Sequence, residues 1–127
     1  MLGDKTAVAT VAVKDMAAAK KFYGETLGLS VDKDTPDGGA LYKAGSSFVF
    51  VYPSQFAGTN QATAISFGVG DDVQAAVNDL KDKGVKFESY DNIPGVTKDG
   101  DVHIMGDIKA AWFKDPDGNI INLVNQM

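Results

Sequence analysis

The stretch that decides the fold is VKDMAAAKKFYGETLGL at residues 13–29, because it returns in altered form as VGDDVQAAVNDLKDKGV at residues 69–85. Each copy starts with valine, continues through an aspartate into an amphipathic run, and ends at a glycine followed by an apolar residue. The offset is 56 residues for both landmarks, from 13 to 69 and from 28 to 84. A repeat of this length and type predicts two βαβββ modules packed around a shared core.

Apolar runs rich in β-branched and aromatic residues surround both copies and predict the strands. Residues 91–106 are expected to form a long loop without a counterpart in the first copy. Aspartates begin both helices, at Asp15 and at Asp71 or Asp72, and Asp-Pro-Asp-Gly at 115–118 predicts a tight turn. The expected strands are 6–13, 29–33, 40–44 and 47–52 in the first copy, and 62–69, 85–90, 108–113 and 119–125 in the second.

The fold class is therefore α+β, with tandem modules at residues 4–52 and 62–126 forming a single domain, 1–127, with a curved, cup-like mixed sheet and helices on its outer face. The chain has 127 residues, of which 44% are hydrophobic and 23% charged, as is usual for a globular domain. Its formal charge of −5 disfavours nucleic-acid partners. We expect a cytoplasmic protein that does not bind membranes, and the absence of cysteine excludes disulfides and thiolate metal sites.

Several motifs together resemble the vicinal oxygen chelate superfamily, which includes glyoxalase I, extradiol dioxygenases, fosfomycin-modifying enzymes and bleomycin-binding resistance proteins. The motifs are Phe22-Tyr23 before Leu27-Gly28-Leu29, the second Val-x-Asp helix, and the run from Trp112 to Asn119. The likeness covers nearly the whole chain. It implies that each module forms half of an open barrel whose concave face holds the ligand.

The resemblance also places the metal ligands, which metal-dependent members supply as His or Gln, Glu, His and Glu from four inward-facing strand positions. The corresponding residues here are Val8, Phe50, Ala64 and Asn122. Divalent metals of this class require imidazole or carboxylate ligands, and a single amide does not form such a site. We therefore expect no bound metal and no cofactor.

Strand alternation then assigns the residues that face the cup. The set combines aromatic walls with small residues on the floor, which suits a flat or apolar small molecule. Alternatively, the aromatic residues fill the space that a metal occupies in relatives. The predicted ligand-binding residues are Val8, Thr10, Phe48, Phe50, Tyr52, Ala64, Ser66, Trp112 and Asn122.

Other residues have both a chemical and a structural interpretation. His103, the only histidine, is a weak candidate for a general base, the alternative being a solvated loop residue. Tyr42 and Tyr90 are candidates for the rim of the cup. The tight turn at residues 115–118 is a sufficient explanation for the presence of Asp115 and Asp117, so neither is expected to be catalytic.

The sequence thus favours a metal-independent protein that binds a small aromatic or apolar molecule, similar to the drug-binding resistance branch, and that is not an enzyme. The alternative is a metal-free isomerase or lyase of the glyoxalase type, and a third interpretation is an interaction subunit with a filled cup. A homodimer is expected, because two open half-barrels leave sheet edges exposed.

Overall fold

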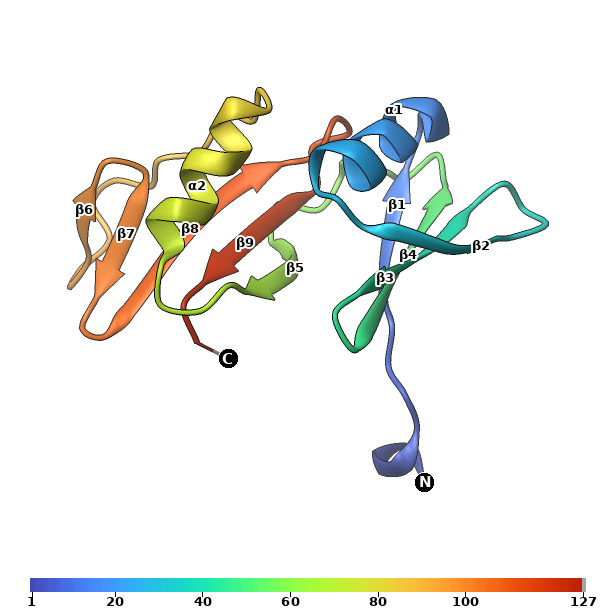
Figure 1. Cartoon of the computed structure of the whole chain (residues 1–127), viewed down its shortest axis with the longest axis horizontal. Coiled ribbons are helices and arrows are strands. Elements are labelled where there is room, and N and C mark those ends of the chain that lie inside the picture. Colours follow the sequence, from blue (N-terminus) through green and yellow to red (C-terminus); the bar gives the residue numbers. More distant parts are fainter. Residues whose placement is uncertain (127) are drawn as a thin grey trace. The chain divides into compact units, whose positions relative to one another are not determined.

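The computed structural model describes residues 1–126, and the chain divides into two compact units, Met1–Asn60 and Gln61–Met127 (Figure 1). Each unit contains one mixed sheet and one principal helical segment, so the predicted α+β class is confirmed. No helix within residues 1–126 has both the length and the apolar character needed to cross a membrane.

The first unit is a four-stranded sheet in the order β1-β4-β3-β2, with β1 parallel to β4 and the other pairs antiparallel. A short α-helix continues directly into a π-helical turn, and both precede β2. The elements are η1 (Leu2–Asp4), β1 (Ala9–Val13), α1 (Met16–Lys20), η2 (Lys21–Thr26), β2 (Ser30–Asp34), β3 (Ala40–Ala44) and β4 (Ser47–Pro53).

The second unit is a five-stranded sheet in the order β5-β9-β8-β7-β6, with β5 parallel to β9. Its helix follows β5, as α1 follows β1. The elements are β5 (Thr63–Gly68), α2 (Val73–Asp82), β6 (Thr97–Asp99), β7 (Val102–Met105), β8 (Ile108–Lys114) and β9 (Ile120–Val124).

The helices begin and end where the repeated sequence predicts. The Asp15 carboxylate accepts a hydrogen bond from the Ala18 amide at 3.0 Å, and Asp72 accepts one from Ala75 at 2.9 Å. These bonds satisfy amides of the first helical turn, which have no partner inside the helix. Gly28 and Gly84 have φ angles of 76° and 91°, a conformation that favours glycine after a helix.

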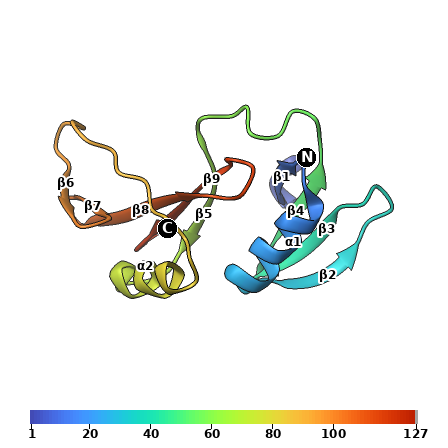
Figure 2. The same cartoon turned by 90° about the horizontal axis from the view of Figure 1, so that it is seen from above.

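Each helix covers one face of its own sheet and leaves the opposite face without a helix (Figure 2). Alternate strand residues are accordingly buried under the helices, while their neighbours point to the helix-free face. Under the helices lie Val11, Val13, Val49 and Val51 in the first unit, and Ile65, Ile121 and Leu123 in the second.

The predicted strand at residues 85–90 is wrong. Only one bridge forms there, between Phe87 and Phe113, and the Glu88 amide donates to the Trp112 carbonyl oxygen at 2.8 Å. The chain then leaves the sheet through Asn92, whose φ of 63° is not a strand conformation, and Pro94, which has no amide proton.

The predicted long loop at residues 91–106 is also wrong, because it contains the β6–β7 hairpin. β7 pairs with β8 on the edge that β2 occupies on β3 in the first unit. The second unit thus keeps the plan of the first but replaces one strand by an inserted hairpin.

The turn between β8 and β9 is built around Asp115, which is only 5% exposed. Its carboxylate accepts hydrogen bonds from the Asp117 amide at 2.9 Å, the Asn119 amide at 2.8 Å and the Asn119 side-chain nitrogen at 2.8 Å. Gly118 completes the turn with a φ of 92°. These contacts explain Asp115 as a structural residue.

Candidate functional site

The helix-free face of the first sheet carries a row of aromatic side chains from β4. Phe48, Phe50 and Tyr52 are all half-buried, and the rings of Phe50 and Tyr52 stack with centroids 5.7 Å apart and planes 11° apart. Thr10 lies beside Phe50 and Ala12 beside Tyr52 in the parallel register of β1 and β4. Strand alternation therefore predicted this face correctly, including its aromatic character.

Glycine is required next to this aromatic row. A Cβ atom on Gly39 would lie 2.7 Å from the Val51 carbonyl oxygen and 3.1 Å from a ring carbon of Phe50. Val51 is paired with β1 on one side and β3 on the other, so its carbonyl oxygen is held in the sheet, and the β2–β3 connection approaches β4 closely only with glycine at this position. The ring of Phe50 thus lies over backbone as well as against Tyr52.

The helix-free face of the second sheet brings together Ser66, Asn122 and Trp112, which are paired across β5, β9 and β8. The Trp112 indole nitrogen donates to the Thr63 hydroxyl at 3.2 Å. Asn122 is buried, and its side-chain nitrogen donates to the carbonyl oxygens of Ala111 and Leu123 at 3.2 and 3.1 Å. The Asn122 amide nitrogen is therefore used within the sheet.

The four positions that the resemblance assigns to metal ligands do not fit a metal ion. Val8 and Phe50 carry only hydrocarbon, and Ala64 is the extra residue of an irregularity between the pairs Thr63–Ile120 and Ile65–Ile121. Asn122 alone supplies a polar atom. Within the described residues 1–126, no three His, Asp or Glu side chains are grouped so that they could hold a metal ion.

His103 is not the solvated loop residue that the sequence suggested. It lies on β7, is 3% exposed, and forms edge-to-face contacts with Trp112 at a centroid distance of 5.1 Å. The Tyr90 ring lies 5.8 Å from His103 and 5.5 Å from Trp112. The three rings form a cluster on the helix-free face, which we call the aromatic triad.

The orientation of His103 is set by the backbone. The Tyr90 amide donates to His103 Nε2 at 3.0 Å, so this nitrogen presents a lone pair and has no proton. Neutral imidazole must then carry its proton on Nδ1. Nδ1 is buried and has no hydrogen-bond partner among residues 1–126.

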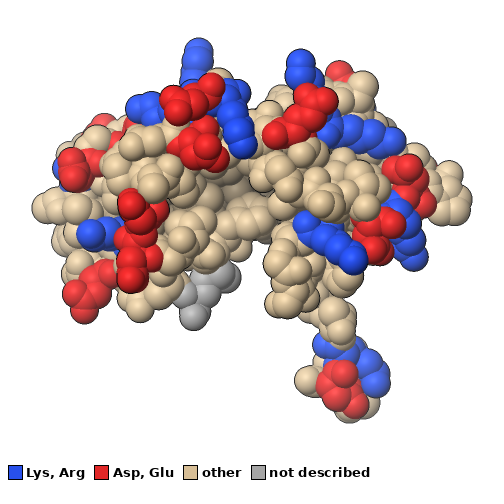
Figure 3. All heavy atoms as spheres, in the orientation of Figure 1, with Lys and Arg blue, Asp and Glu red and all other residues tan. Residues whose placement is uncertain are grey.

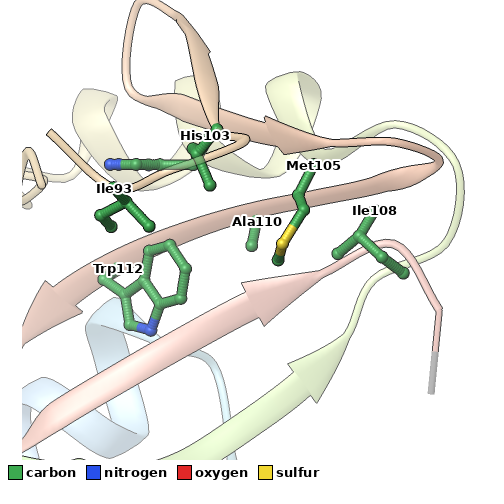
Figure 4. A pocket seen from close by; sticks show the side chains of 7 residues that line it. Ile93, His103, Met105, Ile108, Ala110 and Trp112 are labelled. Atoms are coloured by element: carbon green, nitrogen blue, oxygen red, sulfur yellow. The ribbon is translucent and has the colours of Figure 1, made fainter. Parts of the chain in front are cut away.

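A pocket of about 90 Å³ adjoins the aromatic triad (Figure 4). His103 and Met105 come from β7, Ala110 and Trp112 from β8, and Ile93 from the segment before β6. Figure 2 shows this segment on the side of the second sheet opposite to α2. Among the described residues, the pocket is lined by Ile93, Val96, His103, Met105, Ile108, Ala110 and Trp112.

Sequence reasoning missed Ile93, Val96, Met105 and Ile108 as pocket residues, because it placed the first three in a long loop. The alternation of Val102, His103, Ile104 and Met105 before a glycine could have indicated the additional strand. Ala110 was expected on the same side as Trp112, and the structure confirms this placement.

The candidate rim residues have different environments. Tyr42 is 1% exposed and packs against Tyr23 with ring centroids 6.2 Å apart, so it belongs to the core under the helix and the rim prediction is wrong. Burial raises the pKa of the Tyr42 phenol. Burial, with a smaller contribution from Glu88, also raises the pKa of Tyr90.

Lys98 holds the segment at residues 89–96 against β6. Its ammonium group contacts the Ser89 hydroxyl and forms an ion pair with Asp91. The hydrogen bond from Lys98 and its positive charge together hold the pKa of the Asp91 carboxyl below the ordinary value of 3.8. Since Asp91 is exposed, the pair is a tether for the segment rather than a large contribution to global stability.

We expect this tether to weaken in acid. The pKa of Asp91 is lower in the folded protein than its ordinary value. The stabilising contribution of the Asp91–Lys98 pair is therefore fully present above the ordinary pKa, and it is lost as the pH falls through the lower, folded-state value. Amide exchange measured by NMR at Asn92 and Gly95 should become faster in acid relative to exchange in β8. The Lys98→Gln variant should show the faster relative exchange already at neutral pH, whereas Lys86→Gln should not. Equal protection in wild type and Lys98→Gln would contradict the tether.

The charges on the visible surface are mixed. In the view of Figure 3, acidic and basic side chains alternate over both units and do not gather into one basic area. Examples of close pairs are Lys81 with Asp101 at 2.8 Å and Lys114 with Glu88 at 3.2 Å.

Comparison with solved structures shows the fold. A glyoxalase family protein from Enterococcus faecalis superposes with a TM-score of 0.72 at 21% identity, covering 98% of this chain and 99% of that chain. A variant of the fosfomycin resistance protein FosX from Listeria monocytogenes, complexed with Mn(II) and 1S,2S-dihydroxypropylphosphonic acid, gives 0.72 at 13% identity, with coverages of 100% and 93%. Lactoylglutathione lyase from Agrobacterium tumefaciens gives 0.71 at 16%, with coverages of 98% and 95%.

No curated protein matches the chain in sequence. The sequence model of one family does match, over residues 5–123, which is nearly the whole chain. The matched range includes both strand–helix repeats, the aromatic triad and the Asp115 turn. The chain therefore belongs to the Glyoxalase/Bleomycin resistance protein/Dioxygenase superfamily.

Proposed function

We propose that this protein binds a small, mainly apolar or aromatic molecule on the helix-free faces of its sheets, without a metal ion. The observation that carries the proposal is the chemistry of these faces. Half-buried aromatic rings lie on the first sheet, and an apolar pocket adjoins the aromatic triad on the second. Aromatic surfaces and apolar pockets with few polar groups are typical of small-molecule sites.

The residue types support binding without a metal. FosX is described with Mn(II), but in this chain the assigned ligand positions are Val8, Phe50, Ala64 and Asn122. Mn(II) and similar ions require oxygen or imidazole ligands, and three of these side chains have neither. The Asn122 amide nitrogen moreover donates to two carbonyl groups of the sheet.

Binding is favoured over catalysis by a metal-free isomerase or lyase. Such a reaction needs an acid and a base that can reach the substrate. The lone pair of His103 Nε2 already accepts from the Tyr90 amide, so this nitrogen is not available as a base. The Asp115 carboxylate is occupied by the turn, and burial raises the pKa of the Tyr90 phenol, which makes it a weaker acid.

The net charge of −5 favours a neutral or cationic ligand over an anion.

The proposal includes a cytoplasmic homodimer. Each sheet ends in a strand of the parallel pair, β1 in the first unit and β5 in the second, and such edges are suited to pairing with a second copy.

Thermal shift measurements with indole, benzamidine and planar aromatic cations, in buffer containing EDTA, test the proposal. At least one compound class should raise the midpoint of unfolding in a concentration-dependent manner. Phe50→Leu should weaken the response to a compound that stacks on the first sheet, while Phe56→Leu, at a 68% exposed position away from the strands, should not. No stabilisation by any compound would favour the interpretation as an interaction subunit with filled faces.

A further inference from the structure

The pocket beside the aromatic triad exists because one small residue stands between two large ones on β8. Ile108, Ala110 and Trp112 are each two residues apart and therefore point to the same face of the strand. On the neighbouring strand β7, Met105 pairs with Ile108, and His103 pairs with Ala110. The single methyl group of Ala110 does not fill the space between these larger side chains, so a pocket of about 90 Å³ remains over it (Figure 4).

The pocket is open to solvent at apolar side chains. Ile93 and Met105 line it and are 43% and 54% exposed, whereas Ala110 is only 7% exposed. Single exposed apolar residues are ordinary on a protein surface, but here two of them border the same pocket. A small molecule in solution therefore meets accessible hydrocarbon and thioether groups at this place.

The pocket offers a ligand no hydrogen-bonding partner. The Trp112 indole nitrogen donates to the Thr63 hydroxyl, and His103 Nε2 accepts from the Tyr90 amide. The second ring nitrogen of His103 is buried, so only ring carbons of His103 face the pocket, and no polar atom among residues 1–126 contributes to the pocket surface. A polar group placed in the pocket would lose its hydration without gaining a partner, which costs free energy.

The size of the pocket excludes an aromatic ring. An apolar cavity of about 150 Å³ holds benzene, which has six heavy atoms. At the same ratio of volume to heavy atoms, the 90 Å³ of this pocket hold about four. A planar ring can stack on the helix-free face outside the pocket, but the pocket itself fits a smaller, compact group.

We propose that the pocket over Ala110 is a subsite for a compact saturated alkyl group of about three or four carbons, such as isopropyl or tert-butyl. This inference rests on the proposed small-molecule function and specifies the part of the ligand that the second sheet binds. The alkyl group contacts Met105, Ile108 and Ala110, while the polar part of the ligand stays outside the pocket in water. The unbranched side chain of Met105 adapts to the shape of the group that enters.

The first test uses the wild-type protein and a series of uncharged probes that share one polar end. The probes are N-methyl-, N-isopropyl-, N-tert-butyl- and N-phenylacetamide, and binding is followed through the methyl NMR signals of Met105 and Ile108. The Met105→Leu variant identifies the Met105 signal. Each buried methylene contributes up to about four-fold in affinity, so the tert-butyl compound should bind about ten-fold or more tightly than the methyl compound.

The phenyl compound distinguishes the pocket from unspecific apolar adhesion. Adhesion to apolar surface follows apolar area and would give the phenyl compound the tightest binding at Met105 and Ile108. The pocket predicts the opposite order at these two methyl groups, because the ring is too large to enter. Equal affinities of the methyl and tert-butyl compounds, no saturable shift at either methyl group, or tightest binding of the phenyl compound would overturn the proposal.

A variant that fills the pocket tests the location. Ala110→Val adds two methyl groups at the pocket floor and suits a strand position, so it should weaken binding of the tert-butyl compound by about ten-fold or more. Ala7→Val, at an exposed position before β1, is the matched control and should leave the affinity unchanged. Wild-type affinity in Ala110→Val would contradict the assigned pocket.

A variant that enlarges the pocket tests the size limit and does not depend on the folding of Ala110→Val. Ile108→Ala removes one wall, so the phenyl compound should now bind at Met105 more tightly than the tert-butyl compound. An unchanged order of affinities in Ile108→Ala would contradict the size limit. Failure of these tests with intact binding of aromatic compounds at Phe50 would reject this inference alone, whereas no binding of any compound at either sheet would reject the proposed function as well.

Discussion

Replacing Trp112 by alanine is expected to lower the free energy of unfolding by about 3 kcal/mol and to abolish ligand binding at the second sheet. The indole contacts His103 at 5.1 Å and Tyr90 at 5.5 Å between ring centroids, and its nitrogen donates to Thr63. Truncation removes the ring about which the aromatic triad is organised and opens one wall of the pocket. Urea denaturation followed by circular dichroism, together with titration of indole followed by NMR at residues of the second sheet, measures both effects.

Trp112→Phe is the matched control for this prediction. It keeps an aromatic face toward His103 and Tyr90 but loses the hydrogen bond to Thr63, so its cost should be about 1 kcal/mol. A Trp112→Ala protein that is as stable as wild type, or that binds the probe equally well, would show that the triad does not organise this face. Trp112 is also the only tryptophan, so quenching or enhancement of its fluorescence reports on ligands at this sheet.

Replacing Asp115 by alanine should destabilise the protein by about 3 kcal/mol. Three donors, two amides and one side-chain nitrogen, lose a charged acceptor at a position that is 5% exposed. The midpoint of urea unfolding measures the effect. Under conditions in which the variant is folded, its affinity for small-molecule probes should equal that of wild type, because the carboxylate serves the turn.

Asp115→Asn separates the contributions at this turn. Its side-chain oxygen can still accept from the Asp117 and Asn119 amides, while its NH₂ group would face the Asn119 side-chain nitrogen, a second donor. Its stability should lie between those of wild type and Asp115→Ala. Wild-type stability of Asp115→Ala, or selective loss of binding without loss of stability, would argue for a role of Asp115 in the site.

The repeat determined most of the fold that could be predicted from the sequence. Asp15, Asp72, Gly28 and Gly84 mark helix ends through local hydrogen bonds and φ angles, which depend on short-range sequence alone. The prediction failed at residues 85–106, where the second copy departs from the first. Phe87 and its neighbours have the composition of a strand, but β7 already pairs with most of the β8 edge on which they would have to form one. Which of the two segments pairs with β8 depends on the tertiary structure and not on local sequence.

The same region explains what was missed in the candidate site. Alternation along β4 and β9 placed Phe50, Tyr52 and Asn122 on the correct faces, since a period of two residues is a local property. The burial of His103 and its bond to the Tyr90 amide depend on residues 13 positions apart in a hairpin that the repeat does not contain. The composition of the helix-free faces could therefore be predicted from the sequence, but the aromatic triad could not.

Metal-independent binding is tested by an equilibrium titration of the tightest-binding aromatic compound before and after dialysis against EDTA. Elemental analysis of the same samples determines bound Mn, Ni, Zn and Fe. A metal-independent site should give the same Kd in both samples, no stoichiometric metal, and no change when Mn(II) or Zn(II) is added. Binding that disappears on chelation and returns with one equivalent of a divalent metal would contradict it.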